Sequence, residues 1–421
     1  MTSDKQEIYR DRFLALQKMV YLDSASFGIS SDRVVNAQIE CLRLLAEMPP
    51  VSPDGLAFWE EGNIPSSISS DSILSRDWKG IYELRKTCAE VLGCDSSTIS
   101  LCENTTNAFE TLVSRIKWAS EDEIIITDLE HDSIKNICEL ISHTKGVTLC
   151  QVAGRDLIGH IDFKERLKDR IIRELNAHTR MVVISHIFYN CGLISDPRIL
   201  VDAIKTSRRD RDTETIVVID GAHALGQIPI KVKDYGCDAY VTSGSKWLLA
   251  PPGTGILYVA PWHQEIMWPA DVYDADLPDW WETKRRQLRY SSLNPEDYVL
   301  GVTPQVALIG LRSAIADYLE VGVKNVYSQI GRNAKNTREM LSEVGGYTLQ
   351  TSINGATGMI FISKKGWGIE DVSRTVKLLR QKQIIVASIK DPPSIRISTH
   401  YFNNNEDVKN LAVELSRITR H

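Results

Sequence analysis

The chain reads Ile216-Val-Val-Ile-Asp-Gly-Ala-His and, shortly afterwards, Thr242-Ser-Gly-Ser-Lys-Trp. The first segment is a run of apolar, mostly β-branched residues that predicts a strand buried on both faces. This strand ends at Asp220, and Lys246 follows 26 positions later, in a turn of small and hydroxylated residues. Buried strands of this kind are typical of a mostly parallel, doubly wound α/β sheet, whose ligands bind outside the carboxyl ends of the strands.

The same alternation of apolar runs and amphipathic segments extends over most of the chain. Amphipathic segments such as 162–174 separate the runs and complete βα units. Strands are predicted at Ile99–Cys102, Glu123–Thr127, Val147–Val152, Met181–Ser185, Ile216–Asp220, Ala239–Thr242 and Gly255–Val259.

The pattern changes after about residue 300, where a smaller α+β domain is expected. Its helices and strands are predicted at Thr303–Leu319, Val323–Val344, Thr357–Ile362, Glu370–Gln381, Ser394–Thr399 and Glu406–Ile418. A chain of 421 residues also exceeds the size at which one hydrophobic core stops growing. We therefore expect an N-terminal segment at 1–20 that packs with the small domain, a large cofactor-binding domain at 21–295 and the small domain at 296–421.

The composition is that of an ordinary soluble globular protein. The formal net charge is −6, with 43% hydrophobic and 25% charged residues, so no basic surface for nucleic acid or an anionic membrane is expected. The first residues lack the apolar core of a signal peptide, and no apolar run approaches the length of a membrane span. The eight cysteines are scattered, as reduced thiols are. A cytoplasmic protein is therefore expected.

Lys246 and Asp220 together predict a cofactor. A lysine amine can form a Schiff base with an aldehyde, and a buried carboxylate can hold a protonated ring nitrogen. Either residue alone is commonplace in a loop or at a strand end, but order, spacing and strand context agree here. The pair predicts pyridoxal phosphate (PLP), with Lys246 also acting as the base that removes a substrate proton.

Hydroxyl ligands for the phosphate of PLP are expected at two places. The segment Glu103-Asn-Thr-Thr lies at a predicted strand-to-helix junction, where free backbone N–H groups and the helix dipole favour an anion. Ser243 lies three positions before Lys246. Thr105, Thr106 and Ser243 are therefore the predicted phosphate ligands, although threonines at such a junction also commonly cap helices.

Taken together, these motifs resemble the class V aminotransferase and cysteine desulfurase-like branch of the fold-type I PLP enzymes. The segments Asp220-Gly-Ala-His-Ala-Leu-Gly and Lys246-Trp-Leu-Leu-Ala-Pro are most similar to the isopenicillin N epimerase-like group of that branch. The resemblance covers roughly residues 20–420. It implies an amino-acid-like substrate and a homodimer whose active sites are shared between the subunits.

The resemblance also implies further residues around the cofactor ring. His131 matches the position of an aromatic ring that stacks on the cofactor, where a histidine can act as acid or base near neutral pH. His223 matches a second polar contact, made to the phenolic oxygen of PLP or to Asp220. Either Tyr189 or Asn190 would lie against the ring oxygen.

Two more residues are implied for the substrate and the phosphate. The planar fork of Arg396 suits bidentate capture of a carboxylate, and the resemblance assigns it to the α-carboxylate of an amino acid. Ser292 would complete the phosphate site from the second subunit, although the Arg289-Tyr-Ser-Ser stretch departs from the usual Gly-Thr pair.

The type of reaction is narrowed by one absence. Cysteine desulfurases of this family carry a nucleophilic cysteine in the small domain, and no cysteine follows Cys237. The leading hypothesis is a lyase for C–S or other β-elimination, or a biosynthetic tailoring enzyme of secondary metabolism. An aminotransferase, an epimerase and a catalytically inactive binding protein remain alternatives. Two long segments, 48–76 and 270–289, would suit a bulky substrate through Trp59, Trp280 and Trp281.

Overall fold

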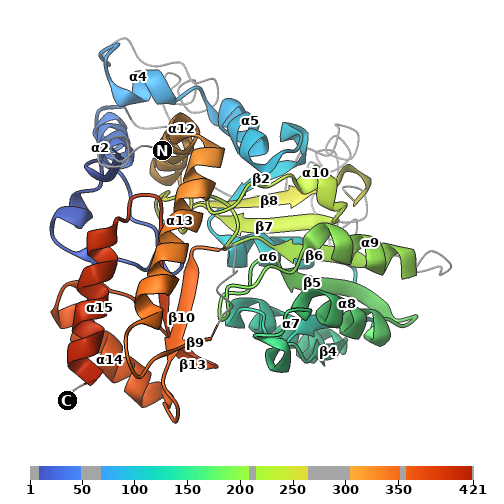
Figure 1. Cartoon of the computed structure of the whole chain (residues 1–421). Helices are drawn as coiled ribbons and strands as arrows, with labels where there is room; N and C mark the ends of the chain where they lie inside the picture. Colours follow the sequence, from blue (N-terminus) through green and yellow to red (C-terminus); the bar gives the residue numbers. More distant parts are fainter. Residues whose placement is uncertain (1–8, 49–67, 208–214, 264–303, 351–356, 420–421) are drawn as a thin grey trace.

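The computed structural model describes residues 9–48, 68–207, 215–263, 304–350 and 357–419. Its largest feature is a seven-stranded sheet with the order β2-β8-β7-β6-β5-β3-β4. The five strands from β4 to β7 run parallel, and β8 is antiparallel to both of its neighbours (Figure 1). The mostly parallel α/β fold is thus confirmed. The strands are β2 (Ile99–Cys102), β3 (Glu123–Thr127), β4 (Thr148–Val152), β5 (Thr179–Ser185), β6 (Ile216–Asp220), β7 (Ala239–Ser243) and β8 (Gly255–Val259).

Alternate residues of the central strands face two different layers of helices. On β6, Ile216 and Val218 join the cluster that contains α6 and α7, whereas Val217 and Ile219 join the cluster that contains α5, α8 and α9. Because helices cover both faces, the central strands need no polar face, which explains the uninterrupted apolar run. These helices are α4 (Ile73–Asp77), α5 (Ile81–Leu92), α6 (Thr105–Val113), α7 (Asp132–Lys145), α8 (Phe163–Glu174), α9 (Pro197–Ser207) and α10 (Val232–Tyr235).

A smaller antiparallel sheet has the order β12-β13-β10-β9 and lies beside α13, α14 and α15 (Figure 1). The helices and strands predicted after residue 300 are all present, with ends shifted by one to a few residues. Strands β9, β11 and β12 were not predicted. The elements after residue 300 are α12 (Gln305–Val321), α13 (Val323–Ser342), β9 (Thr348–Leu349), β10 (Met359–Ser363), α14 (Ile369–Gln381), β11 (Ile384–Ile385), β12 (Ala387–Lys390), β13 (Pro393–Ser398) and α15 (Asn405–Thr419). Helix α2 (Asp32–Glu47) lies earlier in the chain.

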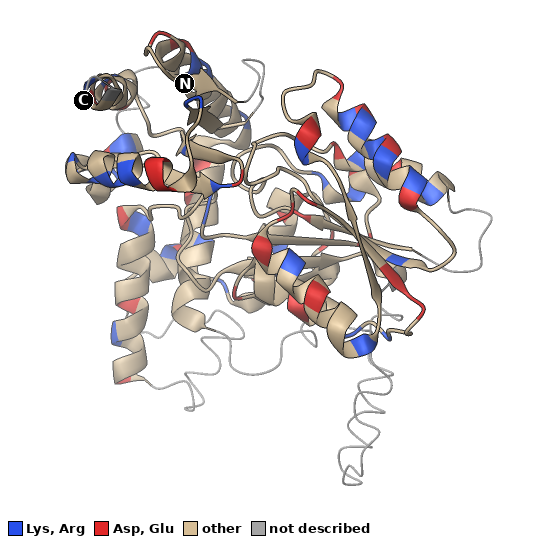
Figure 2. Cartoon of the chain, turned by 90° about the horizontal axis from the view of Figure 1, so that it is seen from below, with Lys and Arg blue, Asp and Glu red and all other residues tan. Residues whose placement is uncertain are grey.

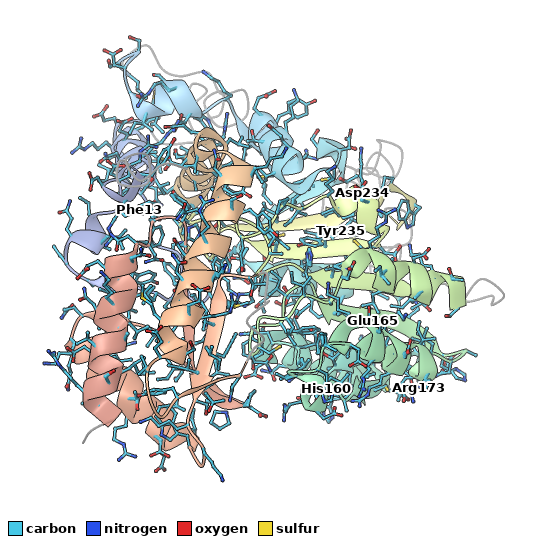
Figure 3. All side chains as sticks on the ribbon, viewed as in Figure 1. Phe13, His160, Glu165, Arg173, Asp234 and Tyr235 are labelled. Atoms are coloured by element: carbon cyan, nitrogen blue, oxygen red, sulfur yellow. The ribbon has the colours of Figure 1, made fainter. Side chains whose placement is uncertain are left out.

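The first described residues lie beside the smaller sheet. Strand β1 (Val20–Tyr21) pairs in parallel with β11. Arg10 forms an ion pair with Asp407 of α15 at 2.8 Å. Phe13, labelled in Figure 3, packs with its ring centroid 4.9 Å from that of Phe402. This segment therefore reaches the end of β13, where Arg396 also lies.

Charged side chains are spread over the outer faces of the helices, and the strands at the centre are mostly uncharged (Figure 2). Acidic and basic residues alternate along these helices without a large region of one sign. None of the helices within the described ranges is long and apolar enough to cross a membrane. Sheets of this kind bind ligands outside the carboxyl ends of their parallel strands, which is where Asp220 and Lys246 lie.

Candidate active site

Five of the predicted site residues lie close enough to change one another's pKa. Burial lowers the pKa of the Lys246 ammonium to about 8, while Asp220 acts to raise it and Arg396 lowers it further. Lys246 and Arg396 add to the lowering that burial causes at His223, and Lys246 does the same at His131. The five residues therefore form one electrostatic cluster, to which the larger sheet contributes four members and the smaller sheet contributes Arg396.

The turn that carries Lys246 is held by two glycines. A Cβ at Gly28 would lie 2.1 Å from the carbonyl oxygen of Lys246, and a Cβ at Gly226 would lie 2.3 Å from the carbonyl carbon of Trp247. The backbone N–H of Gly28 also donates to the carbonyl of Ser245 at 2.7 Å. Because no side chain fits at these distances, both positions require glycine, and the lysine backbone is fixed from two sides.

Asp220 ends β6 and is buried, with 5% of its surface exposed. Its Oδ1 accepts a hydrogen bond from the backbone N–H of Ala222 at 2.8 Å. Burial raises the pKa of Asp220, against the opposing effects of that hydrogen bond and of Lys246. A buried carboxylate with a single backbone donor among the described residues is suited to a cationic partner, which would stabilise its charged form.

His131 lies at the start of α7 and is held in a fixed orientation. Its Nδ1 lies 2.8 Å from Oγ of Ser133 and accepts the Ser133 backbone N–H at 3.2 Å. Its ring meets the ring of Tyr189 edge-on, with centroids 5.0 Å apart. Burial lowers the pKa of His131 to about 4, and the charge of Lys246 adds to this effect. The structure thus presents a flat, neutral aromatic ring, as stacking on a cofactor requires.

His223 is buried between Lys246 and Trp247. Its Nε2 lies 3.4 Å from Nζ of Lys246, and its Nδ1 accepts a hydrogen bond from Nε1 of Trp247 at 3.4 Å. Within the described ranges no hydrogen bond joins its side chain to the carboxylate of Asp220. The alternative contact, to the phenolic oxygen of PLP, stays a prediction.

Tyr189 and Asn190 have different surroundings. The backbone carbonyl of Tyr189 accepts a hydrogen bond from Arg396 at 3.3 Å, and its ring contacts His131. Asn190 is buried and its Nδ2 donates to the carbonyl of Asp391 at 3.4 Å, in the turn between β12 and β13. Of the two, Tyr189 is the residue that contacts other members of the cluster.

Arg396 points from β13 toward the N-terminal turn. One guanidinium nitrogen donates to Oγ of Ser26 at 2.6 Å and lies 3.4 Å from Oδ1 of Asp23. Its Nε is buried and has no hydrogen-bond partner among the described residues. Burial lowers the pKa of Arg396 and raises that of Asp23, although each charge opposes the effect on the other. The guanidinium therefore keeps donor capacity that a carboxylate could use.

The predicted phosphate ligands lie around the start of α6. A Cβ at Gly255 would lie 2.6 Å from the backbone nitrogen of Asn104, so α6 begins directly against β8, where Gly255 pairs with Ser243. Oγ1 of Thr105 is buried without a hydrogen-bond partner in the described chain, and Thr106 is partly exposed. An unpaired hydroxyl at a helix N-terminus fits a phosphate, and with Lys246 and Asp220 the donor set fits PLP.

Three residues of the site escaped the sequence analysis. Asp23 and Ser26 contact Arg396 from a segment without a recognisable motif, more than 360 positions away in the chain. Glu130 immediately precedes His131 in the chain and is fully buried, and its Oε2 accepts a hydrogen bond from the backbone N–H of Ser185 at 2.9 Å. Burial raises the pKa of Glu130 to about 7. The sequence signal that could have identified Glu130 is a charged residue between the buried strand β3 and His131.

Some predictions lie outside the described residues. Ser292 and the segment 270–289 fall there, and so does most of the segment 48–76. Their suggested roles at the phosphate and around a bulky substrate stay predictions.

No cysteine has the character of a nucleophile. Burial raises the pKa of every one of the eight thiols, and none forms a disulfide. A thiol reacts as its thiolate, which a raised pKa disfavours. The thiols are those of Cys41, Cys88, Cys94, Cys102, Cys138, Cys150, Cys191 and Cys237.

Comparison with known proteins places this geometry in a family. The model of the family "Aminotransferase class-V" matches residues 61–411. Isopenicillin N epimerase of Streptomyces clavuligerus is 24% identical over 349 residues, which span 80% of this chain and 84% of that protein. A probable cysteine desulfurase of Methanothermobacter thermautotrophicus is 22% identical over 429 residues, with 98% of both chains covered.

Solved structures agree on the fold. A mutant of C-DES with glycine covalently linked to its PLP cofactor superposes with a TM-score of 0.80 at 20% identity, covering 97% of this chain and 98% of that chain. The cystine C–S lyase C-DES in complex with its product cysteine persulfide gives a TM-score of 0.79 at 21% identity, covering 96% and 99%. At these identities the superposition establishes a common fold.

Proposed function

Because this chain belongs to the class V aminotransferase family of PLP-dependent enzymes, we propose that it is a lyase that cleaves a bond at Cβ of an α-amino acid, most favourably a C–S bond. The observation that carries the proposal is that no cysteine follows Cys237, so the smaller sheet, which contributes Arg396 to the site, has no thiol. The eight thiols that the chain has are buried or half-buried, which raises their pKa. Transfer of sulfur to a cysteine of the enzyme needs a thiolate, whereas elimination needs only a base near Cα. Lys246, with a pKa of about 8, is such a base.

We assign the cofactor contacts as follows. PLP supplies an aldehyde that condenses with amines and a ring that accepts electrons from Cα. Lys246 would bind the aldehyde carbon, and Asp220 would hold the ring nitrogen. His131 would cover a face of the ring, and the hydroxyls of Thr105, Thr106 and Ser243 would bind the phosphate. His223 and either Tyr189 or Asn190 would contact the ring oxygen.

The substrate is bound through its carboxylate by Arg396. The guanidinium holds Ser26 at 2.6 Å and Asp23 at 3.4 Å, and the longer contact is the one that a substrate carboxylate would replace. A substrate carboxylate held by Arg396 would bring Cα toward Lys246, since the two residues are close enough for Arg396 to change the pKa of Lys246. Nζ of Lys246 would then remove the Cα proton, and the thiolate would leave Cβ. In sum, a cysteine thioether and water give a thiol, ammonia and pyruvate, so that atoms and charge balance.

Product analysis tests the assignment. We expect the PLP-loaded enzyme to release pyruvate, ammonia and a thiol or persulfide from cystine or S-alkyl cysteines, without an added keto acid. Cys191→Ala should retain this activity, because the thiol is buried with a pKa raised to about 12, while Lys246→Ala should lose it. A strict requirement for a keto acid, or formation of the D-amino acid without a thiol, would replace the lyase by an aminotransferase or an epimerase. Loss of activity in Cys191→Ala would favour sulfur transfer.

The localisation, the oligomeric state, the origin of the substrate and the domain boundary stay predictions. We propose a cytoplasmic homodimer with Ser292 at the neighbouring subunit's site, a substrate from secondary metabolism, and a domain boundary near residue 295. In support of the N-terminal segment at 1–20 packing with the small domain, Val20 packs against the hydrophobic cluster of the smaller sheet and Arg10 forms an ion pair with Asp407 of α15. Light scattering on the purified protein tests the dimer, and loss of cofactor binding on dilution to monomers would support shared sites.

A further inference from the structure

Trp247 occupies an unusual position next to the lysine. Its side chain is fully buried, and its Nε1 donates to Nδ1 of His223, whose Nε2 faces Nζ of Lys246 at 3.4 Å. The indole stacks on the ring of His400 with centroids 5.7 Å apart, and the Trp247 carbonyl lies 2.8 Å from Nε2 of His400. A Cβ at Gly358 would lie 2.9 Å from the indole ring. The indole therefore has little freedom to move.

His223 is held in place from a second direction. Its backbone carbonyl accepts a hydrogen bond from Nε2 of Gln227 at 2.6 Å, and Oε1 of Gln227 accepts the backbone N–H of Gly358 at 2.6 Å. Gly358 immediately precedes β10. The position of the imidazole is thus tied to the smaller sheet, which also carries Arg396.

These contacts fix which nitrogen of His223 carries a proton. An indole N–H can only donate, so Nδ1 of His223 must accept, and the proton of the neutral ring lies on Nε2. Burial lowers the pKa of His223 well below its usual value, and Lys246 and Arg396 lower it further, so the ring stays neutral. An ammonium group also only donates, whereas a free amine accepts. The contact between Nε2 and Nζ is therefore satisfied only when Lys246 is unprotonated.

We propose that Trp247 is a positioning residue that fixes His223 as a hydrogen-bond donor toward Lys246 and thereby keeps the lysine amine in its unprotonated form. The proposal deepens the function assigned above, since Lys246 must be unprotonated to bind the cofactor and to remove a proton. The other groups acting on the amine are Asp220, which favours its protonation, and Arg396, which opposes it. His131 is neutral at the pH of the experiment.

The tautomer can be measured directly on the cofactor-free protein. In protein labelled with ¹⁵N-histidine, NMR distinguishes a protonated from an unprotonated ring nitrogen, and His223→Gln identifies the signal of His223. We expect Nε2 to be protonated and Nδ1 to be an acceptor. A proton on Nδ1, or a positively charged ring at neutral pH, would overturn the proposal. This measurement requires no variant of Trp247, so it remains decisive if such a variant does not fold.

The consequence for Lys246 is tested with Trp247→Phe, which keeps an aromatic ring against His400 and removes the donor. Without the indole N–H, Nδ1 can take the proton, and Nε2 can then accept from an ammonium group. The midpoint pH for PLP uptake by the cofactor-free protein should rise by about one unit, the effect of about one hydrogen bond. Trp262→Phe, which removes an indole donor at the opposite end of the sheet, should leave the midpoint unchanged. An unchanged midpoint in Trp247→Phe would refute the proposal.

The two results are separable from the proposed lyase activity. Both are read on the tautomer and on cofactor uptake, before any substrate is added. Failure to find a C–S lyase substrate would therefore leave the assignment of Trp247 intact, and a wrong tautomer would leave the lyase assignment intact.

Discussion

Each end of the seven-stranded sheet carries an aspartate, a lysine and a tryptophan, but these residues form different hydrogen bonds at the two ends. At the amino end, the carboxylate of Asp238 accepts from Nζ of Lys205 and from Nε1 of Trp262, both at 2.8 Å, and from the backbone of Val217 at 2.7 Å. At the carboxyl end, the side chains of Lys246 and Trp247 both contact His223 rather than the carboxylate of Asp220. Asp220 keeps one backbone donor among the described residues.

This difference teaches how to recognise a functional carboxylate in a buried setting. Both aspartates are almost completely buried, with exposed fractions of 0% and 5%. Burying an ionised carboxylate is costly unless hydrogen bonds and a cation compensate. Asp238 has that compensation within the chain and so stabilises the fold. Asp220 lacks it, which is what the site of a cationic cofactor ring requires.

The largest difference between the two ends of the sheet is expected when their lysines, Lys246 and Lys205, are each replaced by alanine. Lys246→Ala should abolish the imine absorbance that the PLP-loaded protein shows without added amino acids, and lower turnover by about 10³-fold, since it removes both the covalent attachment point and the base. Lys205→Ala should retain the absorbance and lose stability, because Asp238 would keep a buried charge without its cation. Absorbance spectra and thermal unfolding of both variants check this. Retained imine absorbance in Lys246→Ala freed of amino acids would contradict the account.

The two aspartates should separate cofactor chemistry from stability. Asp220→Asn should lower turnover by about 10²-fold, since the carboxylate no longer holds the ring nitrogen protonated. Because burial raises the pKa of Asp220, its ionisation costs folding free energy as the pH rises above the pKa of an unfolded aspartate. The cofactor-free variant should therefore be at least as stable as the wild type at neutral pH.

Asp238→Asn provides the matched control. It should lose about 1 to 2 kcal/mol of unfolding free energy, because the hydrogen bonds to the Asp238 carboxylate weaken while the partly exposed Lys205 can turn to water, and cofactor affinity should change little. Denaturant unfolding and cofactor titration of the two variants measure both quantities. A loss of cofactor affinity at Asp238 equal to that at Asp220 would remove the distinction between the two ends of the sheet.

A smaller effect is expected for the arginine that reaches the carboxyl end from the smaller sheet. Arg396→Lys should raise KM for the amino acid about tenfold to a hundredfold with a lesser change in kcat, because lysine lacks the planar fork. Arg338→Lys is the control, since Arg338 is equally buried but donates to the backbone carbonyls of Thr357 and Met359. Steady-state kinetics of both variants should show a KM effect for Arg396 alone.

The smallest effect is expected at His131. His131→Phe keeps a flat ring, and the affinity for PLP should fall by no more than about fivefold, within the usual range of an aromatic contact. Burial holds the pKa of His131 at about 4, so the ring is neutral over the working range. The pH profile of kcat/KM between pH 6 and 9 should therefore keep its shape in the variant. Loss of an ionisation near pH 6 to 7 would assign an acid or base role to this residue.

The sequence predicted the larger sheet well for a physical reason. Strands buried on both faces are long apolar runs, and all seven were found within two residues at each end. The smaller sheet was predicted less completely, because β9 and β11 have two residues each and β12 is an edge strand of four. Such short strands depend on tertiary pairing and leave no periodic pattern.

The site residues that lie at or just after the end of a strand could be predicted from the sequence. Asp220 is the last residue of β6 and Lys246 follows β7, and their order and spacing were visible in the chain. Ser26 and Asp23 were not predictable, since they reach Arg396 only through the fold. The roles of Trp247 and Gln227 depend on hydrogen-bond direction, which spacing along the chain does not contain.

Borohydride reduction followed by peptide mass analysis tests the covalent bond between Lys246 and PLP most directly. The PLP-loaded protein is reduced and digested, and the modified peptides are sequenced. The account predicts one reduced pyridoxyl group per chain, located on Lys246 and absent after Lys246→Ala. A stoichiometric group on another lysine, or no group on a protein that binds PLP, would contradict it.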